Sequence, residues 1–247
     1  MQKIDKSNTT LMVVAAGLGT RIQPIDVPKA LVKVNSKPIV FWTLLSFMDF
    51  CKDIVFVISP SRVPNFKKFE KNYKIRITSL TTQSTPNGTA YAIDLGLKDC
   101  STDWVVVIWG DHIGASKFDF KNVVNSDYAL NFDFILPVVR RQNPYVYFKS
   151  LDNLEFYETK LGAEKIQSGI SDCGVFIFKR LVIKEVLGKF LQDLENPTNE
   201  INFLSLFNHF SQIGIRFKML LLEDHLLTFG INTIEDIRIW EKNSNGS

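Results

Sequence analysis

Three short apolar runs constrain the fold of this chain more than any other feature. They occupy residues 11–15 (LMVVA), 54–58 (IVFVI) and 104–109 (WVVVIW). Each run is apolar at successive positions, so both faces of the corresponding strand have to be covered. That requirement is met in a parallel sheet that lies between two layers of helices. We therefore expect these runs to be buried strands of such a sheet.

Helical patterns lie between these runs. Pro38 can open a helix at its first turn, and apolar residues follow it at helical spacing as far as residue 48. Residues 89–97 form a second helix-compatible segment. Alternation of strands and helices predicts an α/β fold with a doubly wound, mostly parallel mixed sheet flanked by helices.

The pattern changes in the second half of the chain. Strand character occurs at residues 129–139, 145–149, 153–157, 174–179 and 215–222, and helical character at 181–191, 202–211 and 233–242. The first three of these strands are separated by turn residues, which predicts a small antiparallel, lid-like addition. No linker rich in Gly, Ser or Pro divides the chain, so we expect a single domain over residues 1–247. Residues 1–10 and 243–247 are expected to be frayed.

Composition excludes several classes of function. A net charge of +3, from 29 basic and 26 acidic residues, is too small to indicate nucleic-acid or membrane binding. Cys51, Cys100 and Cys173 are far apart in the sequence, which argues against a metal cluster or a disulfide framework. No apolar run reaches the length of a signal-peptide core or a membrane span. We expect a cytoplasmic protein, and the oligomeric state is left open.

The segment VVAAGLGTR at residues 13–21, followed by VPKAL at 27–31, carries the strongest functional signal. Gly17 and Gly19 come directly after a predicted strand, and such a turn can point several backbone N–H groups at one anion. Taken alone, the glycines fit equally well a tight turn with solvated lysines. The loop lacks the G-K-[ST] of a Walker P-loop and the third glycine of the dinucleotide fingerprint.

With Pro28 and Lys29 added, the segment resembles the signature of the sugar nucleotidyltransferases, or nucleoside-diphosphate-sugar pyrophosphorylases. That family's pattern is L-A-A-G-x-G-T-R, a short gap, and then P-K-x-L. The chain resembles the isolated pyrophosphorylase domain of the N-acetylglucosamine-1-phosphate uridylyltransferase type. The resemblance implies a Rossmann-like nucleotidyltransferase fold. The implied nucleotide-binding residues are Ala15, Ala16, Gly17, Gly19, Thr20, Arg21, Lys29, Gln83, Gly88 and Thr89.

Gln83 and the PNGTA segment at residues 86–90 resemble the family's nucleotide-base segment. A glutamine amide both donates and accepts hydrogen bonds, which suits the edge of a pyrimidine. Gly88 would let the backbone approach the base, and Thr89 can cap the helix that follows. The alternative is a plain loop with a helix cap.

Two further segments resemble the family's Mg²⁺ site. Asp111 ends a buried strand, where ligands of open α/β sheets bind, and an aspartate there suits a cation that prefers oxygen ligands. Asn232, in the segment FGINT at 229–233, would be the second protein ligand. The alternatives are a turn aspartate at Asp111 and a helix cap formed by Asn232 or Thr233.

The acceptor-binding residues implied by the resemblance are Glu158, Lys160, Asp172 and Gly174, with Lys165 as an alternative to Lys160. This part of the match is loose, because the family's sugar-pocket segments have no clear counterpart between residues 143 and 169. Arg140 and Arg141 form a further basic pair that fits a solvated surface. His112 is of interest because it adjoins Asp111.

The implied reaction joins an NTP to a phosphorylated small-molecule acceptor and releases pyrophosphate. An acceptor phosphate is already an anion, so the reaction needs no side-chain nucleophile. The main obstacle is repulsion between the reacting phosphates, which positioning and positive charge can offset. The resemblance assigns Arg21 and Lys29 to the triphosphate, and a Mg²⁺ on Asp111 and Asn232 to the reacting phosphates.

Three functions remain open. The first is a sugar-1-phosphate nucleotidyltransferase, with UTP as the favoured nucleotide and an NDP-sugar as the product. The second is a cytidylyltransferase that acts on a non-sugar phosphate such as phosphocholine. The third is a nucleotide-binding regulatory subunit without turnover, against which the intact Arg21, Lys29, Asp111 and Asn232 argue.

Overall fold

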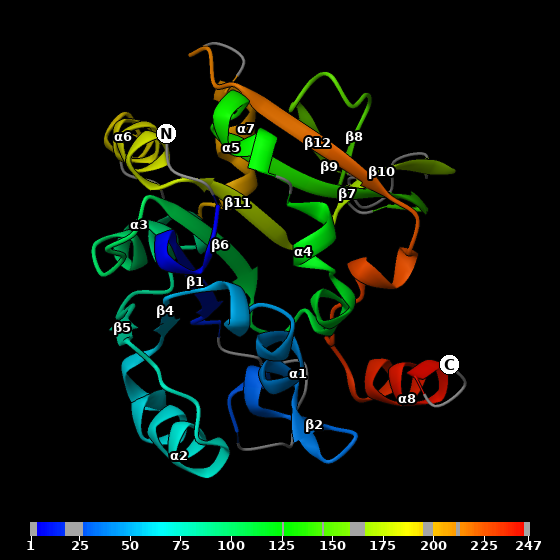
Figure 1. Cartoon of the computed structure of the whole chain (residues 1–247). Coiled ribbons are helices and arrows are strands. Elements are labelled where there is room, and N and C mark those ends of the chain that lie inside the picture. The colour runs from blue at the N-terminus through cyan, green and yellow to red at the C-terminus, as the bar shows by residue number, and fades with distance from the viewer. Residues whose placement is uncertain are drawn as a thin grey trace.

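A ten-stranded sheet crosses the molecule, and nine of its strands follow the order β5-β4-β1-β6-β11-β7-β10-β8-β9 (Figure 1). The tenth strand, β12, pairs with β7 and lies outside this order. The computed structural model describes residues 4–17, 27–124, 126–144, 146–158, 166–194, 200–210 and 213–244. A separate two-stranded sheet is formed by β2 (Lys33–Val34) and β3 (Lys37–Pro38).

The first half of the chain supplies the parallel part of the sheet. Its strands are β1 (Thr9–Ala15), β4 (Asp53–Ile58), β5 (Ser79–Thr82) and β6 (Trp104–Trp109). β1 lies between β4 and β6 and runs parallel to both. The three apolar runs are therefore the adjacent central strands, and their side chains are almost entirely buried.

The second half continues the same sheet with antiparallel strands. These are β7 (Phe134–Gln142), β8 (Val146–Phe148), β9 (Phe156–Glu158), β10 (Ser168–Asp172) and β11 (Val175–Lys179). β11 pairs with β6 and joins the two halves. β12 (Phe217–Leu222) returns parallel to β7. The predicted fold class, a Rossmann-like mixed sheet flanked by helices, is confirmed.

Helices cover both faces. The α-helices are α1 (Ile39–Leu45), α2 (Val63–Tyr73), α3 (Thr89–Leu97), α4 (Phe120–Val123), α5 (Ser126–Asn131), α6 (Arg180–Gln192), α7 (Phe207–Phe210) and α8 (Ile234–Ser244). The 3₁₀ segments are η1 (Lys6–Asn8), η3 (Lys29–Leu31), η4 (Met48–Phe50), η5 (Pro60–Arg62), η6 (Ile113–Lys117), η7 (Phe203–Leu206) and η8 (His225–Thr228). Residues of α1 and α2 pack into one apolar core, and residues of α3, α6, η7 and α7 pack into the core on the opposite face. Among the described residues, no helix is both long enough and apolar enough to cross a membrane.

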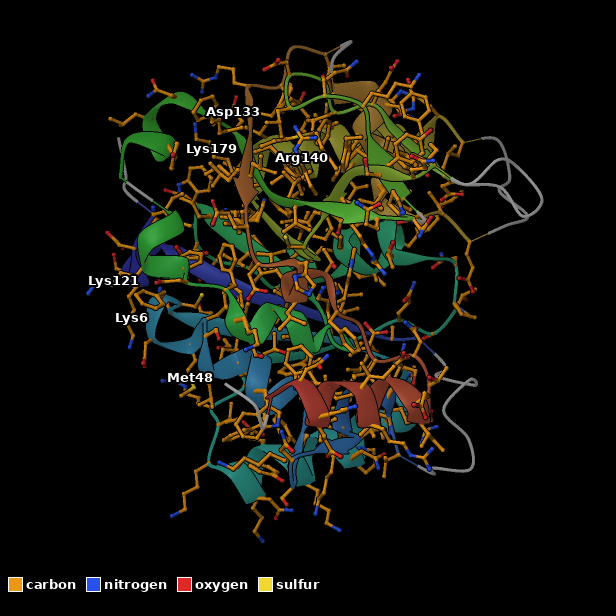
Figure 2. All side chains as sticks on the ribbon, turned by 90° about the vertical axis from the view of Figure 1, so that its right-hand side faces the viewer. Lys6, Met48, Lys121, Asp133, Arg140 and Lys179 are labelled. Carbon is orange, nitrogen blue, oxygen red and sulfur yellow. The ribbon has the colours of Figure 1, made fainter. Side chains whose placement is uncertain are left out.

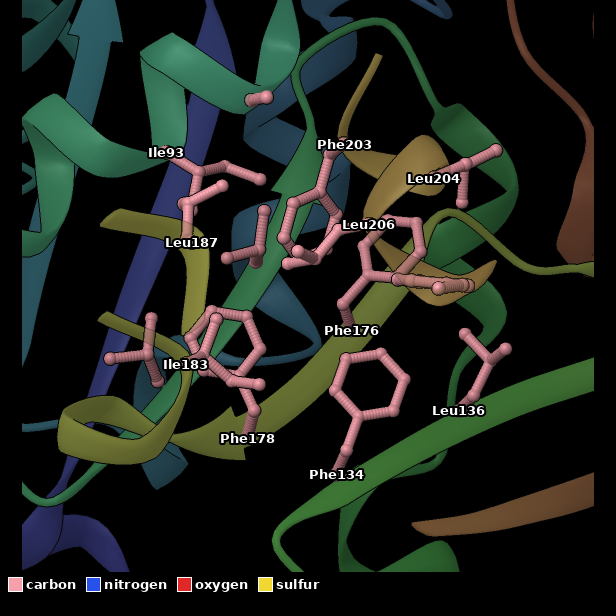
Figure 3. Close-up of a cluster of buried hydrophobic side chains, with 14 of the residues drawn as sticks. Ile93, Phe134, Leu136, Phe176, Phe178, Ile183, Leu187, Phe203, Leu204 and Leu206 are labelled. Carbon is pink, nitrogen blue, oxygen red and sulfur yellow. The ribbon is translucent and has the colours of Figure 1, made fainter. Parts of the chain in front are cut away.

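Phenylalanine rings fill the second core (Figure 3). Phe134 and Phe178, on adjacent strands, stack with their ring centroids 6.2 Å apart. Phe207 meets Phe134 edge-on at 5.1 Å and Phe203 at 5.5 Å. Rings in these offset and edge-on arrangements combine large buried area with favourable quadrupole contacts. This core fixes η7 and α7 against the sheet, which matters for the cavity described below.

Several predicted boundaries were wrong. The strand predicted at 129–139 begins only at Phe134, because residues 126–131 form α5. The predicted helix at 202–211 is a 3₁₀ turn followed by the single turn of α7. Thr9 and Thr10, expected in a frayed segment, are fully buried in β1, and Asn243 and Ser244 belong to α8. Helix α2 and strands β5 and β10 were not predicted.

One buried carboxylate links three strands at the start of β7. Asp133 accepts two hydrogen bonds from Arg216, from Nε at 2.9 Å and from Nη2 at 2.8 Å, and one from Lys179 Nζ at 2.8 Å. Asp133 and Lys179 lie close together in Figure 2. Burial would raise the pKa of Asp133, but the hydrogen bonds and charges of Arg216 and Lys179 outweigh it and lower the pKa to about 2. The charged carboxylate therefore stabilises the folded chain.

We predict that Asp133→Asn lowers the free energy of unfolding at neutral pH. The folded-state pKa lies below the ordinary value of 3.8, so this stabilisation is complete above pH 4 and is lost as the pH falls through about 2. A change of one in pKa is worth about 1.4 kcal/mol, so the lowered pKa of Asp133 corresponds to about 2 kcal/mol of stability. Urea denaturation at several pH values measures it. Glu185→Gln, which breaks the exposed Glu185–Lys189 pair, serves as the control and should leave the midpoint unchanged. Equal stability of the wild type and Asp133→Asn at neutral pH would contradict the prediction.

Candidate active site

A cavity of about 730 Å³ opens at the carboxyl ends of β1 and β6. Ligands of open α/β sheets bind at this edge. The cavity is lined by Val14, Ala15, Ala16, Gly17, Lys29, Ala30, Gln83, Pro86, Gly88, Thr89, Ala92, Trp109, Gly110, Asp111, Glu200, Ile201, Asn202, Leu204 and Asn232. All of the described residues that the sequence assigned to the nucleotide and the metal are thus brought together.

The register of β1 against β6 brings Ala16 and Gly17, where the glycine loop begins, into the cavity that Asp111 lines. Val14 pairs with Trp109, and Gly110 N donates to Val14 O at 2.9 Å. A Cβ atom on Gly110 would lie 2.8 Å from the Cβ of Ala15 and 3.2 Å from the Cβ of Ala30. Only small residues fit where these three segments meet. Gly110 therefore allows η3, with Lys29 at its first position, to approach the end of β6.

Lys29 occupies the centre of the site. Its Nζ donates to Asp111 Oδ2 and, at 2.8 Å, to Asn232 Oδ1. The Lys29 side chain is only 13% exposed, whereas that of Asp111 is 36% exposed. Sequence comparison had assigned Lys29 to the triphosphate. In the structure it joins the two proposed metal ligands, although they are far apart in the sequence.

Backbone hydrogen bonds fix the Asn232 loop beside Asp111. Ile231 N donates to Asp111 O at 2.9 Å, and Gly114 N donates to Phe229 O at 2.8 Å. The His112 ring adds a third link, because its Nε2 lies 2.8 Å from Leu227 O. His112, singled out for its position in the sequence, therefore connects the two loops that carry Asp111 and Asn232.

Helix α8 is capped by Thr233 and Asp236, so the Asn232 side chain is not used as the cap and bonds to Lys29 instead. Thr233 Oγ1 accepts from Asp236 N at 3.2 Å, and Asp236 Oδ2 accepts from the N–H groups of Asn232 and Thr233 at 2.7 Å. Such reciprocal capping satisfies N–H groups that a helix start leaves without intrahelical partners. Of the two proposed caps, Thr233 fills the role.

A small apolar core holds α8 against the segment that follows Lys29. It combines Val34 and Ile39 with Ile113, Ile231 and Trp240, all at most 5% exposed. Lys29, Asp111 and Asn232 are therefore each anchored to the same cluster by a short stretch of chain. This cluster explains how a residue near the end of the sequence reaches the site.

The base segment is held differently from the prediction. Gln83 is buried, and its Nε2 donates to Asn87 Oδ1 at 2.7 Å and to Gly88 O at 3.0 Å. Both amide hydrogens therefore hold the loop, and the carbonyl oxygen is the part of Gln83 that remains for a ligand. Thr89 does not cap α3, because its hydroxyl accepts from Phe203 N at 2.8 Å and the cap position belongs to Gly88.

Gly88 is required where the base segment meets residue 201. Its φ is +105°, and a Cβ atom there would lie 2.2 Å from Ile201 O. Ile201 N donates to Asn87 O at 2.9 Å, and Ala90 N donates to Ile201 O at 3.0 Å. A side chain at residue 88 would break this backbone pairing, which forms one wall of the cavity.

The structure does not bring the described acceptor residues into the cavity wall. Glu158 is exposed on β9. Asp172 Oδ1 accepts from Gly174 N at 2.8 Å, and a Cβ on Gly174, where φ is +64°, would lie 2.6 Å from His112 Nδ1. Burial raises the pKa of Asp172, opposed by the Gly174 N–H and by the charges of His112 and Arg141. Asp172 and Gly174 form a turn beside His112.

Some predicted residues lie outside the described part of the chain. They are Gly19, Thr20 and Arg21 of the glycine loop, and Lys160 and Lys165 of the acceptor region. Sequence reasoning also missed Glu200, Ile201 and Asn202, which line the cavity. An asparagine before an apolar run is typical of a helix cap, and Asn202 indeed accepts from Leu204 N at 3.2 Å. That signal indicates where a helix starts, but it does not indicate that residue 201 pairs with residues 87–90.

The residues present fit a hard divalent cation. Asp111 and Asn232 both offer oxygen atoms, which are the ligands that Mg²⁺ prefers. A cationic group, the Lys29 ammonium, already bonds to both oxygens. Within the described residues, no three or more His, Cys, Asp or Glu side chains form a group that could hold a metal ion. The three cysteines are buried, and burial raises the pKa of Cys51 and of Cys100 to about 12.

The fold and the site define a nucleotidyltransferase-type α/β protein, and the comparisons agree. The model of the MobA-like NTP transferase domain matches residues 11–169. The chain therefore belongs to the family of MobA-like NTP transferase domains. The structure of the inositol-1-phosphate CTP transferase from T. maritima superposes with a TM-score of 0.72, at 19% identity over 97% of this chain and 96% of the other.

Two curated relatives match shorter segments. A glucose-1-phosphate thymidylyltransferase of Neisseria meningitidis is 32% identical over 108 residues, which is 41% of this chain and 37% of the relative. A 2-C-methyl-D-erythritol 4-phosphate cytidylyltransferase of Bifidobacterium longum is 38% identical over 89 residues, which is 34% of this chain and 30% of the relative. The matched segments thus span about a third of each curated relative.

We predict that Gly88→Ala destabilises the cavity wall. The substitution forces a side chain into a positive φ and against Ile201, at a cost on the order of 1–3 kcal/mol. Nucleotide affinity should fall with it, as measured by calorimetric titration alongside thermal denaturation. Gly188→Ala on α6 is the control, because a Cβ there meets no atom within 4 Å. It should raise stability by about 0.5–1 kcal/mol and leave nucleotide binding unchanged. Unchanged binding by Gly88→Ala would contradict this account of the wall.

Proposed function

We propose that this protein couples an NTP, with UTP favoured, to a sugar 1-phosphate, and releases an NDP-sugar and pyrophosphate. The observation that carries the proposal is the convergence of Lys29, Asp111 and Asn232 on a cavity that is shared with the glycine loop. Family membership supports nucleotidyl transfer, and the choice of uridine and of a sugar phosphate rests on the motif resemblance.

In the proposed reaction, an oxygen of the acceptor phosphate attacks the α-phosphorus of the NTP. The bond from that phosphorus to the β-phosphate oxygen breaks, and pyrophosphate leaves with the electron pair. The nucleophile is already an anion, so no side chain has to remove a proton. Catalysis then depends on holding the phosphates in line and on offsetting their repulsion.

Residues of this chain supply that positioning. The loop from Gly17 to Arg21 would bind the triphosphate through backbone N–H groups and the Arg21 guanidinium. Lys29 adds an ammonium in the cavity that Gly17 also lines. Asp111 and Asn232 would hold Mg²⁺, which when bound acts as a Lewis acid and template for the reacting phosphates. Trp109 and Ala92 give the cavity an apolar wall.

Gln83 alone does not select the base, and the choice of a pyrimidine rests on the motif resemblance. Its Nε2 is bonded within the loop, so it offers its Oε1 as an acceptor. Uracil and thymine present a donor at N3, and cytosine presents one at its amino group. All three suit an acceptor at this position, as do the N–H donors of adenine and guanine.

A cytidylyltransferase that acts on a non-sugar phosphate such as phosphocholine is the second candidate. Two observations favour it: the sequence match to a cytidylyltransferase, and the absence of Glu158 from the cavity wall. A regulatory subunit without turnover is a third candidate, but the paired Lys29, Asp111 and Asn232 argue for a working site.

Substrate choice is tested by supplying UTP, CTP, dTTP, GTP and ATP with a panel of phosphorylated acceptors and Mg²⁺. We expect pyrophosphate release to be fastest with UTP and a sugar 1-phosphate. Turnover with CTP and phosphocholine but with no sugar phosphate would overturn that choice. Tight NTP binding without turnover on any acceptor would favour the regulatory role.

We predict that Asp111→Asn and Lys29→Ala each lower the rate of pyrophosphate release at least about a hundredfold. Each removes one contact to the reacting phosphates or their metal, and such contacts are typically worth about 3–4 kcal/mol. Both proteins should remain folded by circular dichroism. Asp49→Asn, at an exposed aspartate on η4, is the matched control and should retain full activity. Unchanged rates in both variants would remove these assignments.

A further inference from the structure

Lys29 bonds to the same two oxygens that we assign to the metal. We propose that Lys29 is a resident cation, which closes the metal position in the free protein and opens it only when a triphosphate enters the cavity. The metal would then be taken up with the nucleotide rather than ahead of it. This inference rests on the proposed function, because it takes Asp111 and Asn232 as the metal ligands.

The first step of the argument is competition for the same atoms. Asp111 Oδ2 and Asn232 Oδ1 both accept hydrogen bonds from the one ammonium, at 2.8 Å in the case of Asn232. A dication bound to these oxygens at about 2.1 Å would lie within contact distance of Lys29 Nζ. Two positive groups cannot share so small a space, so Lys29 has to leave before a metal binds.

The second step is the poor screening of that repulsion. The Lys29 side chain is 13% exposed and that of Asp111 is 36% exposed, so water screens the ammonium less than it screens a surface lysine. Charges in partly buried positions interact more strongly than they do in bulk water, and added salt screens them less. A free divalent cation therefore meets a site whose negative charge is already neutralised at short range.

The third step is where Lys29 can go. Its backbone is fixed in η3, where Val32 N donates to Lys29 O at 3.1 Å, and its side chain is a flexible four-carbon stem. The same cavity is lined by Ala16 and Gly17, where the glycine loop begins. A triphosphate bound there offers the ammonium a stronger anion than Asp111. Only such a ligand compensates Lys29 for the contacts that it gives up.

The consequence for the free protein is an Asp111 carboxylate that is paired while no ligand is bound. The chain then needs no metal to keep the site in order. Free Mg²⁺ does not prime the site, and the metal–nucleotide complex is the species that enters. Lys29 would contribute twice, first by reserving the metal position and then by binding the triphosphate.

The test uses Mn²⁺ as a paramagnetic probe in the absence of nucleotide, with free Mn²⁺ measured by electron paramagnetic resonance. We expect Lys29→Met to bind Mn²⁺ at least tenfold more tightly than the wild type. Lys68→Met, at an exposed lysine on α2, makes the same change in net charge and should match the wild type. Lys29→Arg, which keeps a cation, should also match it. Lys29→Met/Asp111→Asn should lose the gain.

Two outcomes would overturn the proposal: equal Mn²⁺ affinity of the wild type and folded Lys29→Met, or a gain that persists in Lys29→Met/Asp111→Asn. If Lys29→Met does not fold, an NMR measurement on the wild-type protein tests the proposal instead. Its Lys29 ammonium resonance, followed by ¹H–¹⁵N NMR, should stay in place with Mg²⁺ alone and shift with Mg²⁺ and UTP. A shift with Mg²⁺ alone contradicts the proposal. None of these readouts requires turnover. A failure of the proposed reaction would be seen separately, as no pyrophosphate release from any substrate pair.

Discussion

The parallel pairing of β1 with β6 is the constraint on which the rest of the site depends. It aligns Val14 with Trp109, and this alignment sets Gly17 and Asp111 in one cavity at the same edge of the sheet. The contact is close because Ala15, Ala30 and Gly110 are small. On its other side β6 pairs with β11, so the same strand also joins the parallel half of the sheet to the antiparallel half. A shift of one residue in this register would turn the side chains of β6 to the opposite core and separate Lys29 from Asp111.

Much of the fold could be predicted because its central strands are buried on both faces. The runs at β1, β4 and β6 have to be apolar throughout, so the sequence signals them directly. Helix α3 matches the predicted residues 89–97, because its apolar positions face the core at helical spacing. Asp111 and Lys29 were identified because each lies within a short local motif. Local patterns of this kind are independent of the rest of the chain.

The sequence could not predict which hydrogen-bond partner a polar side chain takes where tertiary contacts offer several. Thr89 stands where a helix cap would, yet its hydroxyl bonds to Phe203 N, far away in the sequence. Gln83 has the amide that a base requires, but its N–H groups are used by Asn87 and Gly88. Residues 200–202 reach the cavity only because the phenylalanine core fixes η7 against the sheet. Residues 126–131 form a helix although the sequence pattern predicted a strand from residue 129. The local sequence does not indicate this difference.

The placement of Asn232 has a consequence for the order in which the protein matures during its synthesis. The sheet from β1 to β12 is complete once residue 222 has been made, and it can begin to pack as the chain emerges. Asn232 gains its position only when α8 docks through Trp240 onto the apolar cluster that contains residues 34 and 39. A ribosome-bound chain could therefore have a folded core and still lack the contact between Asn232 and Lys29. Competence would be acquired in a late, separate step, after most of the molecule has folded.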